Sequence, residues 1–206
     1  MSPAGETGGA IVSPRINTAL AGNPNCGKTT VFNALTGSRQ RVGNWPGVTV
    51  ERMEGAFRHA EREVNVIDLP GIYAFSALSL DESIAREYIL RQKPDVVVNI
   101  LDASNLERNL YLTTQLLEMQ VPVVVALNMM DVVRKRRIRI EVEHLAEHLK
   151  CPVIPIVASK GVGLEELRDA IVRVADARQA PTPGPRYDSV VEEALEALMP
   201  SLAAAA

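Results

Sequence analysis

Residues 22–29 of the chain, GNPNCGKT, have the residue types and the spacing of a phosphate-binding loop. Glycines let such a loop curl until its backbone N–H groups point at phosphate oxygens, and the helix that follows adds partial positive charge. Lys28 would reach the β- and γ-phosphates, and the Thr29 hydroxyl is a suitable ligand for Mg²⁺. The nucleotide-binding candidates in this segment are Asn23, Asn25, Cys26, Gly27, Lys28, Thr29 and Thr30.

A second motif, DLPG at residues 68–71, follows an apolar segment that we expect to be a strand. Asp68 can hold Mg²⁺ through a water molecule, and the Gly71 N–H can bind a γ-phosphate. The switch threonine that closes over both is expected to be Thr49, with Gly47 and Val48 beside it as further candidates. Residues 40–50 contain two glycines, a proline and no apolar periodicity, so we expect them to be mobile without ligand.

The sequence NMMD at residues 128–131 matches N-x-x-D and indicates that the base is guanine. The Asp131 carboxylate would accept hydrogen bonds from guanine N1–H and N2–H₂, and adenine offers no such pair. Asn128 completes the motif, and Met129 replaces its usual Lys with a thioether that can lie against the purine. After the last expected strand, a backbone N–H of Ala158 or Ser159 would meet guanine O6.

Apolar and amphipathic segments alternate from residue 16 to about residue 176, which predicts a doubly wound α/β fold with a mostly parallel, six-stranded sheet. Val-rich runs such as 96–98 and 123–125 are typical of strands covered on both faces. The expected strands are residues 16–21, 53–58, 64–69, 96–102, 123–128 and 153–157. The expected helices are residues 28–36, 80–91, 106–119, 140–150 and 164–175.

Composition argues against several function classes. The chain has 206 residues and a formal net charge of −3, which does not suit nucleic-acid binding through bulk electrostatics. We expect no bilayer-crossing segment, because no apolar run approaches the ~18–20 residues that one requires, and we expect no secretory signal. Cys26 and Cys151 do not make a disulfide framework, so we expect a reducing compartment.

Together with VGNWPGVT at residues 42–49, these motifs resemble the G domain of ferrous iron transport protein B (FeoB). The resemblance runs from about residue 16 to residue 175, and its Trp-Pro stretch is the most specific part. It implies a GTP-binding and GTP-hydrolysing nucleotide switch on the cytoplasmic face of the bacterial inner membrane. In that family, a helical domain and then a membrane domain that passes Fe²⁺ follow the G domain.

The chain is expected to divide into a leader (1–14), the G domain (15–177), a Pro/Gly linker (178–186) and the start of a truncated helical domain (187–206). The fragment itself is expected to be soluble. The expected partners are GTP or GDP and the protein's own helical and membrane domains, which these residues lack. A homo-oligomer stays open, and nucleic acid is not expected.

The resemblance also implies roles for single residues. The implied catalytic residues are Lys28, Thr49, Gly71 and Asn25. Thr29 and Thr49 would ligate Mg²⁺, with Asp68 acting through a water molecule. Asn25 would help to bind an activating K⁺, with backbone carbonyls near Gly43 and Trp45. Ile72 stands where Ras-like proteins have a water-orienting Gln, so we expect slow, K⁺-stimulated hydrolysis.

Two other function classes stay open. One is a soluble Era-like GTPase in RNA or ribosome maturation, against which the acidic charge balance weighs. The other is a nucleotide-gated interaction module with incidental hydrolysis, which the missing Gln keeps open.

Outside the motifs, His144 and His148 have a metal-ligand spacing, but we expect both on a solvated helix face. The basic run at residues 134–139 is expected to be a solvated loop before a helix; its alternative role is contact with anionic lipid or a partner. His59 has no partner that the sequence suggests, and Trp45 fits either a core position or an exposed lid.

Overall fold

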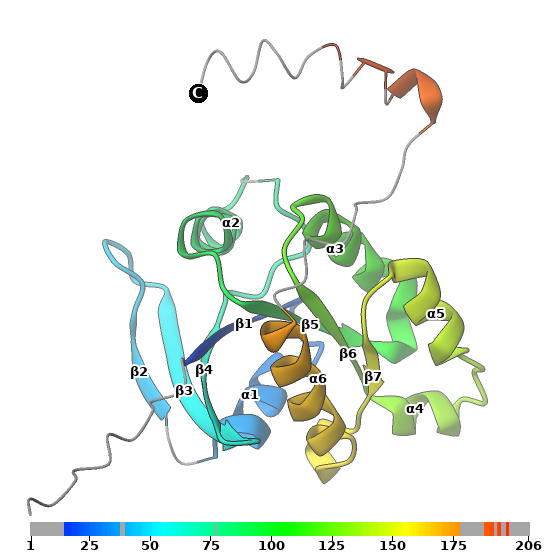
Figure 1. Cartoon of the computed structure of the whole chain (residues 1–206), viewed down its shortest axis with the longest axis horizontal. Coiled ribbons are helices and arrows are strands. Elements are labelled where there is room, and N and C mark those ends of the chain that lie inside the picture. The colour runs from blue at the N-terminus through cyan, green and yellow to red at the C-terminus, as the bar shows by residue number, and fades with distance from the viewer. Residues whose placement is uncertain are drawn as a thin grey trace, which may run out of the picture.

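The computed structural model describes residues 15–37, 40–76, 78–177, 188–191, 193–194 and 197, and it shows one central sheet with helices on both faces (Figure 1). The strands are β1 (Ile16–Gly22), β2 (Gln40–Asn44), β3 (Glu51–His59), β4 (Arg62–Asp68), β5 (Val96–Asp102), β6 (Val123–Asn128) and β7 (Val153–Pro155). The helices are α1 (Lys28–Thr36), α2 (Leu80–Gln92), α3 (Leu106–Glu118), α4 (Met130–Lys135), α5 (Val142–Leu149) and α6 (Leu164–Asp176). The predicted doubly wound α/β fold is confirmed.

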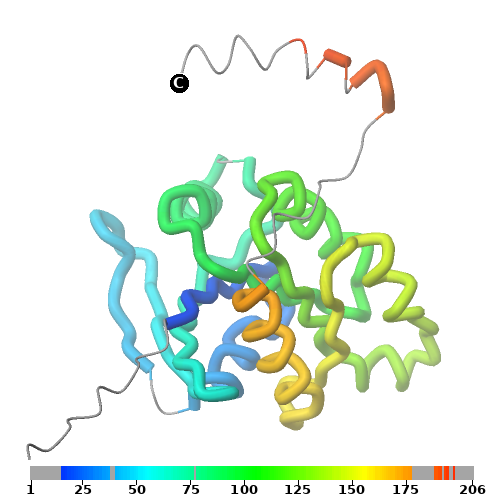
Figure 2. Tube along the Cα trace, in the orientation of Figure 1, coloured from blue at the N-terminus to red at the C-terminus, as the bar shows by residue number. Residues whose placement is uncertain are grey.

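The strands follow the order β2-β3-β4-β1-β5-β6-β7. From β4 to β7 all neighbours are parallel, whereas β3 runs antiparallel to both β2 and β4. β1, at the blue start of the tube in Figure 2, lies between β4 and β5. The strand order therefore reverses at β1, which has β4 on one side and β5 on the other. Ligands of such folds bind beside the carboxyl end of the strand at which the order reverses.

Two apolar clusters cover the two faces of the sheet. On one face, α1 and α6 pack Phe32 and Ile171 against buried side chains of β1, β5 and β6. On the other face, α2 and α3 bury residues such as Ile89 and Leu112, and the partly buried side chains of α5 pack beside them. Both faces of the parallel strands are thus covered, which explains their continuous Val and Ile runs.

The sheet has seven strands rather than the predicted six, because β2 forms within residues 40–50, where we expected a segment mobile without ligand and no strand. β2 is an edge strand that pairs with β3 in the register Val42↔Met53. Four of its five residues are exposed, so no apolar alternation marks it in the sequence. Pairing with β3, rather than burial, defines this strand.

α4 is a second correction, because residues 134–139 were expected to be a loop before a helix. Arg134 and Lys135 form the last turn of α4, and Arg136 caps its carboxyl end. With six residues and one buried side chain, Val133, this helix is too short to show a periodic pattern. The rest of the run, through Arg139, follows it as predicted.

The predicted division into domains stays a prediction. The leader (1–14) and the linker (178–186) lie outside the described residues, as does most of the segment 187–206. None of the helices within the described residues has the length and the apolar character that a bilayer-spanning helix needs.

Candidate functional site

The phosphate-binding loop connects the carboxyl end of β1 to the first turn of α1. Gly27 has a φ of 87°, and a Cβ at this position would lie 2.4 Å from the Asn128 side-chain nitrogen. Asn25 also has a positive φ, 66°. The loop therefore needs glycine at residue 27 both for its backbone conformation and for its close contact with Asn128 at the carboxyl end of β6.

Lys28 and Asp68, from two different motifs, meet at the mouth of this loop. The Lys28 Nζ donates a hydrogen bond to the Asp68 Oδ1 at 2.5 Å, and the two side chains are 12% and 8% exposed. Burial raises the pKa of Asp68, and the Lys28 charge opposes that rise. In this state the pair neutralises itself, whereas a bound phosphate and cation would give each side chain a new partner.

The segment after β4 lies against the phosphate-binding loop. The Ile72 N–H donates to the Gly22 carbonyl at 3.2 Å. A Cβ at Gly71 would lie 3.4 Å from the Pro24 Cα, so residue 71 follows the loop closely. Thr29 and Thr30 are exposed in the first turn of α1, where their hydroxyls are accessible.

Asn128 joins three of the predicted motifs. Its Nδ2 donates to the Cys26 carbonyl at 3.0 Å, and its Oδ1 accepts from the Ala158 N–H at 3.1 Å. The side chain is 4% exposed, so these hydrogen bonds are shielded from water. Asn128 therefore fixes the guanine-side loops to the phosphate-binding loop, a structural role that the motif alone did not predict.

Asp131 lies at the start of α4 and is partly exposed. Its Oδ2 accepts a hydrogen bond from the Lys160 Nζ at 2.8 Å, and this bond lowers the pKa of Asp131. Met129, with a φ of 64°, precedes α4, and Ser159 is exposed in the loop after β7. Lys160 was missed by the sequence reasoning, although its place next to Ala158-Ser159 could have indicated it. The carboxylate is thus held ionised where the guanine base was predicted.

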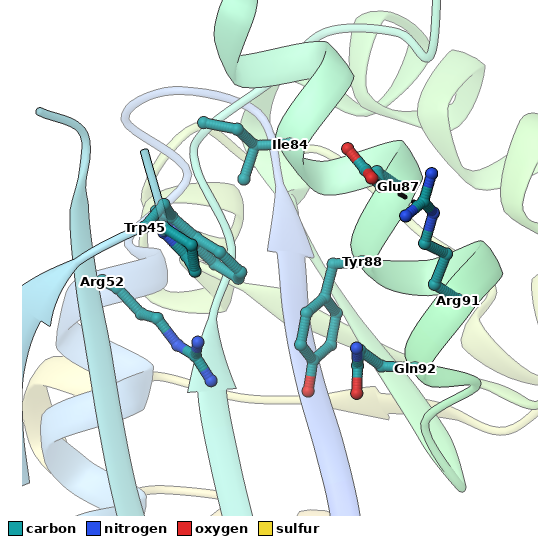
Figure 3. Close-up of a pocket in the computed structure, with 8 residues that line it drawn as sticks. Trp45, Arg52, Ile84, Glu87, Tyr88, Arg91 and Gln92 are labelled. Carbon is teal, nitrogen blue, oxygen red and sulfur yellow. Dashed lines mark ion pairs between the residues drawn. The ribbon is translucent and has the colours of Figure 1, made fainter. Parts of the chain in front are cut away.

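In the stretch that contains the predicted switch threonine, residues 45–50, a buried residue lies beside exposed ones. Trp45 is 6% exposed, so it is a core position rather than a lid, and its ring meets Tyr88 edge-on at 5.5 Å. Figure 3 shows Trp45 and Arg52 facing the side chains of α2 across a pocket of about 340 Å³. The Trp45 carbonyl accepts from the Val48 N–H at 3.2 Å, closing a turn.

Gly47 within this turn and Thr49 just after it are exposed, and no hydrogen bond among the described residues joins Thr49 to the phosphate-binding loop. The sequence correctly places Thr49 between α1 and β3. Its predicted role beside Thr29 as a Mg²⁺ ligand stays a prediction.

Asn25 lines a polar cavity of about 160 Å³ with Tyr73 and Arg108, and no residue of the stretch 43–49 contributes to that cavity. The predicted combination of Asn25 with carbonyls near Gly43 and Trp45 is therefore not assembled here. Arg108 was missed by the sequence reasoning. Its position just after the carboxyl end of β5, at the same sheet edge as the motifs, was the available signal.

The two cysteines are poor nucleophiles. Burial raises the pKa of the Cys26 thiol to about 11 and that of the Cys151 thiol to about 12. Both thiols are therefore protonated at neutral pH, which weighs against a redox role for Cys26.

The histidines behave as surface residues. His144 and His148 are exposed on α5 as predicted, and the described residues include no cluster of three potential metal ligands. His59, for which the sequence suggested no partner, lies 2.6 Å from an Asp169 carboxylate oxygen. None of the three extends the candidate site.

Comparison with known proteins agrees with this geometry. The family described as ferrous iron transport protein B matches residues 16–171. The Fe(2+) transporter FeoB of Escherichia coli K12 is 56% identical over 163 residues, which cover 77% of this chain and 21% of that protein. The chain thus spans about a fifth of the length of the curated relatives that it matches.

Solved structures give the same result. The cytosolic domain of L. pneumophila FeoB superposes with a TM-score of 0.84 at 44% identity, covering 91% of this chain and 81% of that one. The cytosolic domain of T. maritima FeoB in a GDP form gives a TM-score of 0.86 at 41% identity, covering 90% and 73%. The FeoB G domain of Methanococcus jannaschii gives 0.71 at 46% identity, covering 80% and 99%.

Proposed function

The chain belongs to the ferrous iron transport protein B family, and from this premise we propose that it binds GTP with Mg²⁺ and hydrolyses it to GDP and phosphate. The observation that carries the proposal is the Asn128 side chain, which holds the phosphate-binding loop and the base-side loops together. With these loops joined, we assign the Asp131 carboxylate and the Lys28 ammonium to the two ends of one site. That arrangement fits a guanine base at one end and phosphates at the other.

The donor set at the phosphate end fits Mg²⁺. The Thr29 hydroxyl lies at the start of α1, and the Asp68 carboxylate ends β4, so hard oxygen ligands are available from both elements. Thr49 would add a third oxygen once the switch closes. When bound, Mg²⁺ would neutralise charge on the β- and γ-phosphate oxygens.

The chain's own groups do the rest. Lys28 would leave Asp68 and pair with the phosphates, and the backbone N–H groups of residues 25–29 would surround them. The Gly71 N–H would meet the γ-phosphate as charge develops on it. Because Ile72 supplies no polar side chain to orient the attacking water, we propose slow turnover.

The proposal is tested by changing the base-reading residue. Asp131→Asn replaces an acceptor of two hydrogen bonds with an amide that presents a donor to guanine N1–H, so GTP affinity is expected to fall by about 100-fold or more. Xanthine nucleotides, which carry a carbonyl in place of the amino group, should become acceptable. Calorimetry of both nucleotides with both proteins measures the exchange, and unchanged GTP binding would refute guanine recognition.

We further propose that K⁺ stimulates hydrolysis, with the Asn25 side-chain oxygen as one ligand. A cation near the β–γ bridge would stabilise the charge that a partner's arginine meets in Ras-type systems. The structure leaves the 43–45 carbonyls away from the Asn25 cavity, so the site would form only when the switch closes. Hydrolysis should be about tenfold faster in KCl than in NaCl, and Asn25→Ala should abolish the difference. Equal rates in the two salts would remove K⁺ from the mechanism.

For the whole protein, we propose that this domain is a nucleotide switch on the cytoplasmic side of an Fe²⁺ transporter. The E. coli relative that matches this chain is named an Fe(2+) transporter, and the match covers only 21% of that protein's length. The test is Fe²⁺ uptake by cells that carry the full-length gene with and without Asp131→Asn. The rival interaction module with incidental hydrolysis predicts uptake that follows nucleotide binding but not turnover.

A further inference from the structure

Arg108 is a cation beside the phosphate-binding loop that the proposed mechanism does not use. It is the third residue of α3, and its side chain lines the cavity shared with Pro24 and Asn25. A cation in the first turn of a helix is electrostatically unfavourable, because the helix dipole is positive there. The helix dipole therefore does not favour an arginine at this exposed position, but a contact outside α3 does.

That contact is with Tyr73, two residues after Gly71. The Arg108 guanidinium carbon lies 4.1 Å from the centre of the Tyr73 ring. A cation over an aromatic face is attracted by the ring's quadrupole, and the planar guanidinium adds stacking that an ammonium cannot provide. Tyr73 is 41% exposed, so burial alone does not account for its position.

The same arginine also contacts the phosphate-binding loop through its backbone. Its carbonyl accepts a hydrogen bond from the Asn23 Nδ2 at 3.3 Å. Farther along α3, the Gln115 Oε1 accepts from the Phe75 N–H at 2.9 Å. Helix α3 therefore holds the segment 73–75 at two points and the phosphate-binding loop at one.

These contacts bear on Gly71, whose N–H is the proposed donor to the γ-phosphate. On one side of it, the Ile72 N–H is fixed to the Gly22 carbonyl. On the other side, Tyr73 begins a stretch that contains no helix or strand among its described residues up to α2. Without the contact to Arg108, the direction of the chain after Ile72 would depend on hydrogen bonds farther along.

We propose that Arg108 is a positioning residue for GTP hydrolysis: by holding the Tyr73 ring against α3, it keeps residue 71 close to Pro24 of the phosphate-binding loop, where the Gly71 N–H is the proposed donor to the γ-phosphate. This inference rests on the proposed function. Arg108 acts through Tyr73 and not on the phosphates, so it should affect turnover much more than nucleotide binding.

The first experiment measures steady-state hydrolysis and GDP affinity. Arg108→Ala should lower kcat about three- to fivefold, the rate equivalent of one such contact, with GDP affinity changed less than about twofold. Arg108→Lys should recover part of the loss, because it keeps the charge but not the stacking. Arg134→Ala, at an exposed arginine of α4, is the matched control and should behave as the unmodified chain.

The second experiment asks whether the effect passes through Tyr73. In a double-mutant cycle, Arg108→Ala should cost little in a Tyr73→Leu background, because the contact is already lost. In the nucleotide-free chain, Arg108→Ala should speed amide hydrogen exchange of residues 72–76 selectively. This readout does not require hydrolysis, and thermal unfolding of each variant checks that it is folded.

Three results would overturn the inference: unchanged kcat in Arg108→Ala, an equal cost of that substitution with and without Tyr73, or a loss of GDP affinity as large as the loss of kcat. The proposed function fails differently. An unmodified chain that binds GTP but does not turn it over refutes hydrolysis, and hydrogen exchange then still reports whether Arg108 holds the segment.

Discussion

The two ends of the candidate site are built in opposite ways. At the base end, Asn128 is buried and makes two hydrogen bonds that join three loops, and Asp131 is paired with Lys160. At the switch end, Thr49 is exposed, and β2 is an edge strand with four exposed residues. The base end is therefore held together by buried hydrogen bonds, whereas the switch end would have to rearrange for Thr49 to take its proposed role.

This difference follows from what each end is proposed to do. Groups that are already in place bind a ligand without the cost of being ordered, which suits recognition of a base common to GTP and GDP. A segment that is ordered only by the γ-phosphate and its cation distinguishes the two nucleotides. Trp45 marks the border, since its ring is buried against Tyr88 while Pro46, Gly47 and Thr49 after it are exposed.

The largest expected difference between the two ends is in the free energy of unfolding after an asparagine is replaced in each. Asn128→Ala leaves the Cys26 carbonyl and the Ala158 N–H buried and unpaired, so the free energy of unfolding is expected to fall by about 2–4 kcal/mol. Asn44→Ala, at an exposed position of β2, should change it by less than about 0.5 kcal/mol. Urea unfolding of the nucleotide-free proteins measures both. Similar values would mean that the base end is no more assembled than the switch.

A second prediction concerns the effect of the switch threonine on GDP affinity and on hydrolysis. Thr49→Ala should leave GDP affinity nearly unchanged, because Thr49 is exposed and, among the described residues, makes no hydrogen bond to the phosphate-binding loop in this state. Hydrolysis should fall at least about tenfold, equivalent to ~1.4 kcal/mol of transition-state stabilisation. Calorimetry with GDP and phosphate-release kinetics give the two values. A collapse of GDP affinity would instead make Thr49 part of the permanent fold.

The smallest expected effect concerns the Cys26 thiol, whose pKa burial raises to about 11. The neutral thiol is the form that the fold favours, so iodoacetamide should react slowly at pH 8 and faster only as the pH approaches that value. Asn128→Ala should speed the reaction by loosening the loop, while Thr49→Ala should not. Mass spectrometry of the labelled peptide measures the rate. Rapid labelling of the unmodified chain would show that the phosphate-binding loop opens readily.

Much of the fold could be predicted from the sequence, because strand and helix patterns are local. α1 has the predicted bounds, Lys28–Thr36, and β5 and β6 do as well. The two misses, β2 and α4, are short and mostly exposed, so neither carries the burial pattern on which such predictions depend. The members of the three motifs follow from residue spacing, whereas the K⁺ role of Asn25 rests on the family resemblance.

What the sequence by itself determined is therefore which side chains are available at the carboxyl edge of the sheet, and their chemistry. Only the tertiary structure decided which of them meet. Asn128 reaches Cys26 across 102 residues of chain, and Lys28 reaches Asp68 across 40. Such contacts depend on the strand order and register, which no local pattern records. Arg108 and Tyr73 meet for the same reason: parallel strands bring the loops at their carboxyl ends to one edge, however far apart they lie in the sequence.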